Sequence, residues 1–315
     1  MFFVQGCLEY YRALRTLEDE LNIVSHGEDK EAYLSTAILF YERLGEWLAD
    51  PQLSGRPKVE KPPADGTTAL GDVMCMASLA LDFLEKLPWS TGHPLATDER
   101  KAGLMAAIKQ TMKDVQRHYE PERRILLENV PAHGVDLSTP DGRFFNPGHS
   151  IEVAWFLLHM CEVVPDEELS QLALNVLEGS LELGWDEAYG GGILYMMDLL
   201  GKPMVDATVT KDGKLWWPIT EALYALVYAY TLTNDEKWLV WLRKVHEYAY
   251  TYFADPTGGG EWFGPRAQAI RLRLRCIWPH LTGCLWPQGT STATAAGCTT
   301  SRAGTTRAAF MCRGR

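Results

Sequence analysis

The sequence lacks the cysteine spacing that marks a metal centre or a redox pair. Its seven cysteines include no CxxC pair and no paired metal-ligand spacing, whereas zinc sites and thioredoxin-like motifs require one. Cys7, Cys75 and Cys161 fall within helical patterns, which is typical of buried thiols in a reducing compartment. We therefore expect no metal site.

Long apolar runs and a positive net charge are also missing. No run approaches the length of a membrane span, and the apolar start at residues 1–8 is too short for a signal peptide because charges follow it at once. The formal net charge of −11 argues against nucleic acids and anionic membranes as partners. There is no GxSxG sequence, and the glycines at 190–192 lack the Lys of a phosphate loop. These absences predict a cytoplasmic protein.

What the sequence does contain is a repeated helical pattern. Hydrophobic residues make up 46% of the 315 residues, enough for a sizeable core. Their spacing predicts eight helices, at about 1–23, 30–49, 70–87, 98–119, 149–163, 166–183, 219–231 and 235–253. The eight form four antiparallel pairs, and such pairs stack into an α-solenoid or close into an α/α toroid. The long connections all join one helical pair to the next, so we expect them to lie on one face of the fold, together with a functional site.

Local signals predict how some of these elements begin. Asp166 is a plausible N-cap for the sixth helix. Thr233 and Glu236 have the spacing of a capping box for the eighth helix. Residues 26–29 predict a turn, and residues 125–130 predict a short strand.

The stretch 142–156 begins as a turn and ends as a helix. Asn146 is followed by Pro and Gly and then by an apolar run, which places His149 in the first turn with Glu152 on the same face. The helix N-terminus disfavours the imidazolium, whereas the carboxylate favours it. A pKa that stays near neutral would suit a general base. The alternative is a histidine that only caps or packs, because a single His/Glu pair is weak support for catalysis.

The wider pattern resembles the N-acylglucosamine 2-epimerase family, also known as renin-binding protein. The resemblance rests on four motifs in family order: RxxNPGHxxExxW at 143–155, GWD and GGILY at 184–195, KLWWPITEA at 214–222, and DP with GEWFG at 255–264. It covers roughly residues 1–264. It implies an all-α (α/α)6 barrel, with a site at the centre of the loop-rich face.

The resemblance implies that the protein interconverts N-acetylglucosamine and N-acetylmannosamine at C2 of the open-chain sugar. A base removes the C2 proton, an enolate-like intermediate forms, and a proton returns to the other face. His149 matches one of the family's two catalytic histidines, and Glu152 would orient or charge it. Glu221 matches a glutamate that contacts substrate, or it only stabilises the start of its helix. Glu128 and Asn129 are weaker candidates.

The other candidates are substrate-binding residues. Trp216 and Trp217 could stack on sugar faces, although each taken singly is more typical of a core. Glu261 matches a family position near the site. Arg143 and Asn146 could hydrogen-bond sugar hydroxyls or could hold the turn, and the turn is favoured for Asn146.

The two ends depart from the family pattern. Residues 1–7 resemble the middle of a family member, so about two helical hairpins and a substrate-contacting Arg have no counterpart. Residues 265–315 contain eight Arg, no Lys, Asp or Glu, and four of the seven Cys. His280 does not match the family's second catalytic His. We interpret 1–264 as a partial barrel and 265–315 as a disordered tail read out of frame or from an intron. The alternative is a natural basic tail. We therefore expect little epimerase activity.

Other functions remain open. A related aldose–ketose isomerase or disaccharide 2-epimerase is one alternative, although NPGH and KLWWP favour the N-acyl sugar member. A renin-binding protein without catalysis is the other. The resemblance also implies a homodimer and chemistry without a required cofactor. ATP or another nucleotide could act as an effector, and no residue here marks its site.

Overall fold

The computed structural model describes only part of the chain. The described residues are 1–23, 29–50, 66–89, 91–188, 190–200, 213–255 and 262. The chain divides into two units, Met1–Arg275 and Cys276–Arg315, and the second lies outside the described residues. The predicted turn at 26–29 (apart from Asp29), the candidate Glu261 and the tail at 265–315 also lie outside them.

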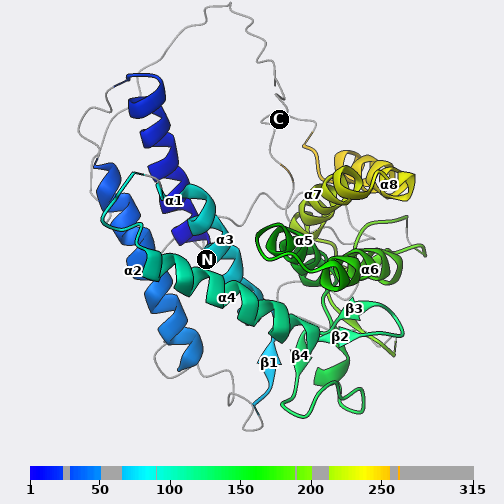
Figure 1. Cartoon of the computed structure of the whole chain (residues 1–315). Helices are drawn as coiled ribbons and strands as arrows, with labels where there is room; N and C mark the ends of the chain where they lie inside the picture. Colours follow the sequence, from blue (N-terminus) through cyan, green and yellow to red (C-terminus); the bar gives the residue numbers. More distant parts are fainter. Residues whose placement is uncertain are drawn as a thin grey trace, which may run out of the picture. The chain divides into compact units, whose positions relative to one another are not determined.

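All eight predicted helices are present in the described residues (Figure 1). They are α1 (Phe2–Arg15), α2 (Lys30–Ala49), α3 (Leu70–Lys86), α4 (Asp98–Gln116), α5 (Pro147–Val163), α6 (Glu167–Gly184), α7 (Trp216–Thr233) and α8 (Glu236–Tyr252). A π-helical turn, Thr16–Glu20, continues α1. The prediction for α2 matches its bounds, and the Asp166 side chain caps α6 as predicted, accepting from the Leu169 N–H.

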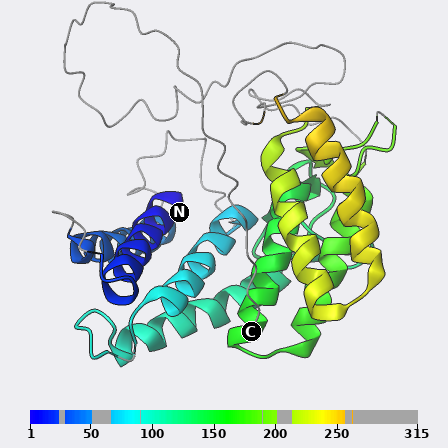
Figure 2. The same cartoon turned by 90° about the horizontal axis from the view of Figure 1, so that it is seen from above.

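The helices pack as the four predicted pairs, α1 with α2, α3 with α4, α5 with α6, and α7 with α8 (Figures 1 and 2). In addition, α1, α3, α5 and α7 contact one another in chain order. Burial agrees with this arrangement, because 11 of the 17 residues of α5 are buried but only four of the 17 in α8. A helix that is covered on most sides belongs to the interior of a helical stack. Within the described residues, no helix is both long and apolar enough to cross a membrane.

Short antiparallel ribbons lie in the long connections between the pairs. They are β1 (Thr68–Ala69) with β4 (Asn129–Val130), β2 (Tyr119–Glu120) with β3 (Ile125–Leu126), and β5 (Phe144–Phe145) with β6 (Met197–Asp198). The strand predicted at 125–130 is therefore two strands with different partners. Between them, Glu128 donates its N–H to the Phe144 carbonyl and accepts from the Leu70 N–H. These bonds tie the loop before α5 to the first residue of α3.

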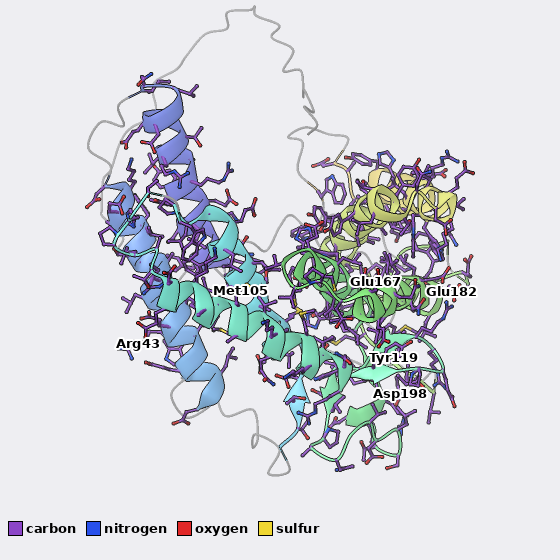
Figure 3. All side chains as sticks on the ribbon, viewed as in Figure 1. Arg43, Met105, Tyr119, Glu167, Glu182 and Asp198 are labelled. Carbon is purple, nitrogen blue, oxygen red and sulfur yellow. The ribbon has the colours of Figure 1, made fainter. Side chains whose placement is uncertain are left out.

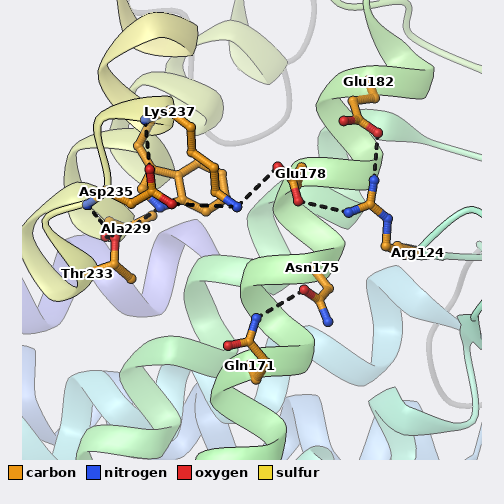
Figure 4. Close-up of polar contacts among 10 residues, drawn as sticks. Arg124, Gln171, Asn175, Glu178, Glu182, Ala229, Thr233, Asp235 and Lys237 are labelled. Atoms are coloured by element: carbon orange, nitrogen blue, oxygen red, sulfur yellow. Dashed lines mark hydrogen bonds and ion pairs between the residues drawn. The ribbon is translucent and has the colours of Figure 1, made fainter.

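One arginine joins the β2–β3 turn to α6 (Figure 4). Arg124 donates to Glu178 at 2.8 Å and to Glu182 at 2.7 Å, one turn apart on α6. Lys237 of α8 also lies 3.1 Å from Glu178. The turn approaches α6 so closely that a Cβ added at Gly179 would overlap the carbonyl oxygen of Arg124. Glycine is therefore required at this contact.

The capping box predicted for α8 is wrong. Asp235, not Thr233, caps the helix, because its carboxylate accepts from the Lys237 N–H at 2.9 Å. The Thr233 hydroxyl instead donates to the Ala229 carbonyl in the last turn of α7 (Figure 4). The reason is that α7 runs on to Thr233 and stops at Asn234, whose φ of 52° is left-handed. The new helix can start only after that residue.

We expect Asp235→Ala to lower the free energy of unfolding by about 1 kcal/mol, the usual cost of losing an N-cap acceptor. Urea unfolding followed by circular dichroism measures it. Glu247→Ala, an exposed site on the same helix, is the control and should change stability by less than about 0.5 kcal/mol. Equal effects of the two substitutions would contradict the assignment of Asp235 as the cap.

Candidate functional site

The site is built on the first turn of α5. Asn146 ends the preceding extended segment, and its side-chain oxygen accepts from the His149 N–H at 3.2 Å. Pro147 occupies the first helical position, where its missing N–H costs nothing. These two residues start the helix and place His149 in its first turn, as the sequence predicts. The His149 side chain is 26% exposed.

Glu128 is the residue that holds the His149 ring. Its Oε2 lies 2.8 Å from His149 Nδ1. The sequence left open whether Glu152 orients or charges the ring, and the orienting contact comes from Glu128, which was the weaker candidate. Side chains on a helix lean towards its N-terminus, so the imidazole reaches back to the loop before α5. Glu152 follows His149 along the helix and makes no side-chain hydrogen bond within the described part of the chain.

Opposing effects set the pKa of His149. Burial lowers this pKa, but the hydrogen bond to Glu128 and the charges of Glu128 and Glu152 raise it, and the net shift is upward. Glu152 thus acts on the ring through charge alone. The raised pKa makes the His149 imidazole a stronger base, because a neighbouring carboxylate stabilises the protonated ring.

Two acids and an indole continue the site along α5 and α7. Trp155 donates its Nε1–H to Glu221 Oε2 at 2.9 Å. Burial raises the pKa of Glu221, and this hydrogen bond partly offsets the effect. Burial, together with the charge of Glu221, raises the pKa of Glu152 to about 7. Near neutral pH the site therefore contains a carboxylic acid that can donate a proton. Trp155 was not singled out from the sequence, although it closes the motif at 143–155.

The raised pKa of Glu152 predicts a pH-dependent effect of Glu152→Gln. The pKa of Glu152 in the unfolded chain is about 4.3. Above that pH, folding either protonates Glu152 or buries its charge, which costs free energy. This cost stops growing only above pH 7, where Glu152 is also ionised in the folded state. The neutral amide avoids this cost. We expect the variant to be up to about 3 kcal/mol more stable at pH 8 and only about 1 kcal/mol more stable at pH 5, where the unfolded carboxyl is already mostly ionised.

Urea unfolding at the two pH values tests this expectation. Glu247→Gln, on the exposed face of α8, is the control and should behave alike at both. A stability difference for Glu152→Gln that does not depend on pH would contradict the raised pKa.

Of the two predicted tryptophans, Trp217 borders His149. Their ring centroids are 5.4 Å apart, and the planes are inclined by 37°. Trp217 also lies edge-on to Tyr195, at 6.1 Å. It packs so closely on α5 that a Cβ added at Gly148 would come within 2.5 Å of the indole. Trp216 is 37% exposed, and among the described residues it forms no ring pair with His149.

Arg143 and Asn146 make structural contacts, so of the two roles that the sequence left open for them, the structure supports holding the turn. The Arg143 guanidinium is buried and donates to Asp198 at 3.0 and 3.2 Å (Asp198 is labelled in Figure 3). Its remaining nitrogen donates to the carbonyls of Leu137 and Ser138. All three nitrogens are thus used within the protein. Asn146 is 1% exposed and serves as the N-cap, which agrees with the turn interpretation.

Other motif residues have structural roles on either side of residues 201–212. Lys214 and Asp186, from the KLWWPITEA and GWD motifs, form a buried ion pair of 2.7 Å. Gly192 has a φ of 88°, and a Cβ there would overlap the Tyr248 ring. The ion pair joins Lys214, three residues before Trp217, to the segment that follows α6. No group of three or more metal-ligating side chains occurs among residues that the structure describes.

Comparisons with known proteins identify the family of this chain. A family model described as N-acylglucosamine 2-epimerase (GlcNAc 2-epimerase) matches residues 104–279. N-acylglucosamine 2-epimerase of Bos taurus is 31% identical over 258 residues, which cover 80% of this chain and 56% of the bovine protein. The Mus musculus protein is 30% identical, with 80% and 57% covered. The chain therefore spans about half the length of the curated relatives it matches.

Solved structures support the fold. Cellobiose 2-epimerase from Bacillus thermoamylovorans B4167 has a TM-score of 0.59 and 17% identity, with 84% of this chain and 62% of that chain covered. A D-mannose isomerase has a TM-score of 0.54 and 17% identity, with 84% and 63% covered. The predicted all-α fold is confirmed, and the described helical pairs are those of an (α/α)6 barrel.

Proposed function

Because the chain belongs to the N-acylglucosamine 2-epimerase family, we propose that His149 transfers the C2 proton of an open-chain N-acyl amino sugar. The substrates are N-acetylmannosamine and N-acetylglucosamine. The proposal rests on the environment of the His149 ring. One nitrogen is held by Glu128, the side chain is partly exposed, and the ring stands beside the Trp217 indole.

The chemistry follows from the groups present. The aldehyde at C1 acidifies the C2 proton, and His149 takes that proton as the C2–H electron pair moves towards C1 and leaves an enolate oxygen. Glu152, with a pKa of about 7, supplies a proton donor for the developing oxyanion. Glu221 has one oxygen bonded to Trp155, and its other oxygen can accept from a sugar hydroxyl. The Trp217 indole offers an apolar face to the sugar ring.

The comparisons favour an N-acyl amino sugar over a disaccharide. The N-acylglucosamine 2-epimerases match this chain over 258 residues, whereas cellobiose 2-epimerase of Ruminococcus albus matches over 126 at 28% identity. Renin binding, a homodimer, a nucleotide effector and a cytoplasmic location stay predictions that rest on the sequence.

Deuterium exchange tests the proposal without requiring complete epimerisation. The purified chain is incubated with N-acetylmannosamine in D₂O, and proton NMR follows the C2–H signal and the appearance of N-acetylglucosamine. We expect loss of the C2–H signal, because one base that removes and returns a proton is enough for exchange. Cellobiose is the comparison substrate. If the folded chain gives no exchange above the protein-free rate, the proposal is wrong.

A further inference from the structure

Two backbone hydrogen bonds hold Glu128 in a position from which its carboxylate reaches His149. The backbone N–H of Glu128 donates to the Phe144 carbonyl at 2.9 Å, and its carbonyl accepts from the Leu70 N–H at 2.8 Å. One bond ties it to β5, just before α5, and the other ties it to the start of α3. The Glu128 side chain is only 11% exposed. Its carboxylate meets His149 Nδ1 at 2.8 Å.

Two uncharged residues border this pair. On the α3 side, a Cβ at Gly71 would lie 3.6 Å from both Glu128 Oε1 and His149 Cε1, and on the α7 side the ring is beside Trp217. The charge of Glu128 also acts on His118, but burial lowers the pKa of His118. The charges that act on the ring are those of Glu128 and, from α5, Glu152. Glu128 is the one that also bonds it.

This bond decides which ring nitrogen carries the proton. An ionised carboxylate can only accept hydrogen bonds, so the neutral imidazole beside it must carry its proton on Nδ1. The lone pair then lies on Nε2, the nitrogen opposite Glu128. An isolated imidazole side chain prefers the other tautomer, so the contact would reverse an intrinsic preference. The same carboxylate would stabilise the imidazolium that forms when the ring accepts a proton.

We propose that Glu128 is the positioning residue of this site, which holds His149 in the Nδ1–H tautomer and makes Nε2 the atom that takes the C2 proton. The identity of the transferred proton rests on the proposed function. The tautomer itself does not.

Nitrogen NMR tests the tautomer directly. The chain is labelled with ¹⁵N-histidine, long-range proton–nitrogen spectra are recorded across a pH series, and the His149 signals are assigned by their loss in His149→Gln. We expect the neutral ring to be protonated on Nδ1. In Glu128→Ala we expect the Nε2–H tautomer to dominate and the pKa to fall. Glu122→Ala, an exposed glutamate of the neighbouring turn, should leave both unchanged.

Glu128→Gln separates charge from shape if the alanine variant folds poorly, because the amide has nearly the same size but no charge. It should lower the pKa of His149, so the acidic limb of the pH profile for C2 exchange should move to lower pH. The exchange rate at pH 8 should fall at least about tenfold, because the imidazolium loses its stabilising carboxylate.

The outcomes separate the two ideas. An Nε2–H tautomer in the unaltered chain, or an unchanged tautomer and pKa in Glu128→Ala, overturns the positioning role even if exchange is observed. The expected tautomer switch in a chain that exchanges no C2 proton supports the positioning role while it refutes the proposed function. C2 exchange that is equal in rate and pH profile in the chain and in Glu128→Gln also overturns the positioning role.

Discussion

Replacing His149 by Ala should reduce deuterium exchange at C2 of N-acetylmannosamine by at least about 100-fold. A positioned general base contributes roughly 10²–10⁴ in rate, and the two nearby acids have other roles in the proposal. Glu152, whose pKa is about 7, is the proton donor for the oxyanion. Glu221 accepts from Trp155 with one oxygen and contacts a sugar hydroxyl with the other. The expected result is a rate close to that of the protein-free solution.

Proton NMR of the C2–H signal measures this loss, and two controls make it specific. His133→Ala removes an exposed histidine of the loop before α5 and should leave the rate unchanged. Added imidazole should restore part of the exchange to His149→Ala, because it can enter the space that the side chain leaves. Exchange retained at more than about a tenth of the original rate would contradict His149 as the base.

Replacing Arg143 by Met should cost about 3–5 kcal/mol of the free energy of unfolding. The change leaves the buried Asp198 carboxylate without its cation, and breaking one side of a buried ion pair has this cost. It also removes the donor that satisfies the carbonyls of Leu137 and Ser138. These losses should loosen the segment that leads into Asn146 and α5.

Urea unfolding measures this cost, and the chain offers a matched surface pair. Arg43 on α2 forms an exposed ion pair with Glu46 at 2.6 Å (Figure 3 labels Arg43). Arg43→Met should cost less than about 1 kcal/mol. Adding Asp198→Asn to Arg143→Met should recover part of the loss, because the buried charge is removed while an acceptor for the Leu200 N–H is kept. Similar costs for Arg143→Met and Arg43→Met would contradict a structural role for the buried pair.

The helical pairs could be predicted from the sequence because they depend on short-range periodicity. Apolar residues three and four positions apart mark one face of a helix wherever it packs. The start of α5 was equally local, since Asn146, Pro147 and His149 are consecutive or nearly so. The cap of α8 was predicted two residues too early. The error arose because Thr233 and Asp235 are both good caps, and only the end of α7 at Asn234 decides between them.

The contacts of the site residues that the sequence did not predict join residues far apart in the chain. The sequence favoured Glu152 as the partner of His149 because it is three residues away. Glu128 is 21 residues away and approaches only because its backbone is bonded to Phe144 and Leu70. The role of Arg143 was open for the same reason, since Asp198 follows it by 55 residues.

The sequence by itself determined the number and order of the helical pairs, the place of His149 at a helix start, and the family to which the chain belongs. Hydrophobic spacing, capping residues and motifs are all local properties, so they can be recognised before the chain is folded. Only the tertiary structure decided which carboxylate holds the imidazole, which arginine is buried, and which tryptophan borders the ring. Those contacts join distant segments, and hydrogen bonds acting over about 3 Å select among them only after the helices have packed.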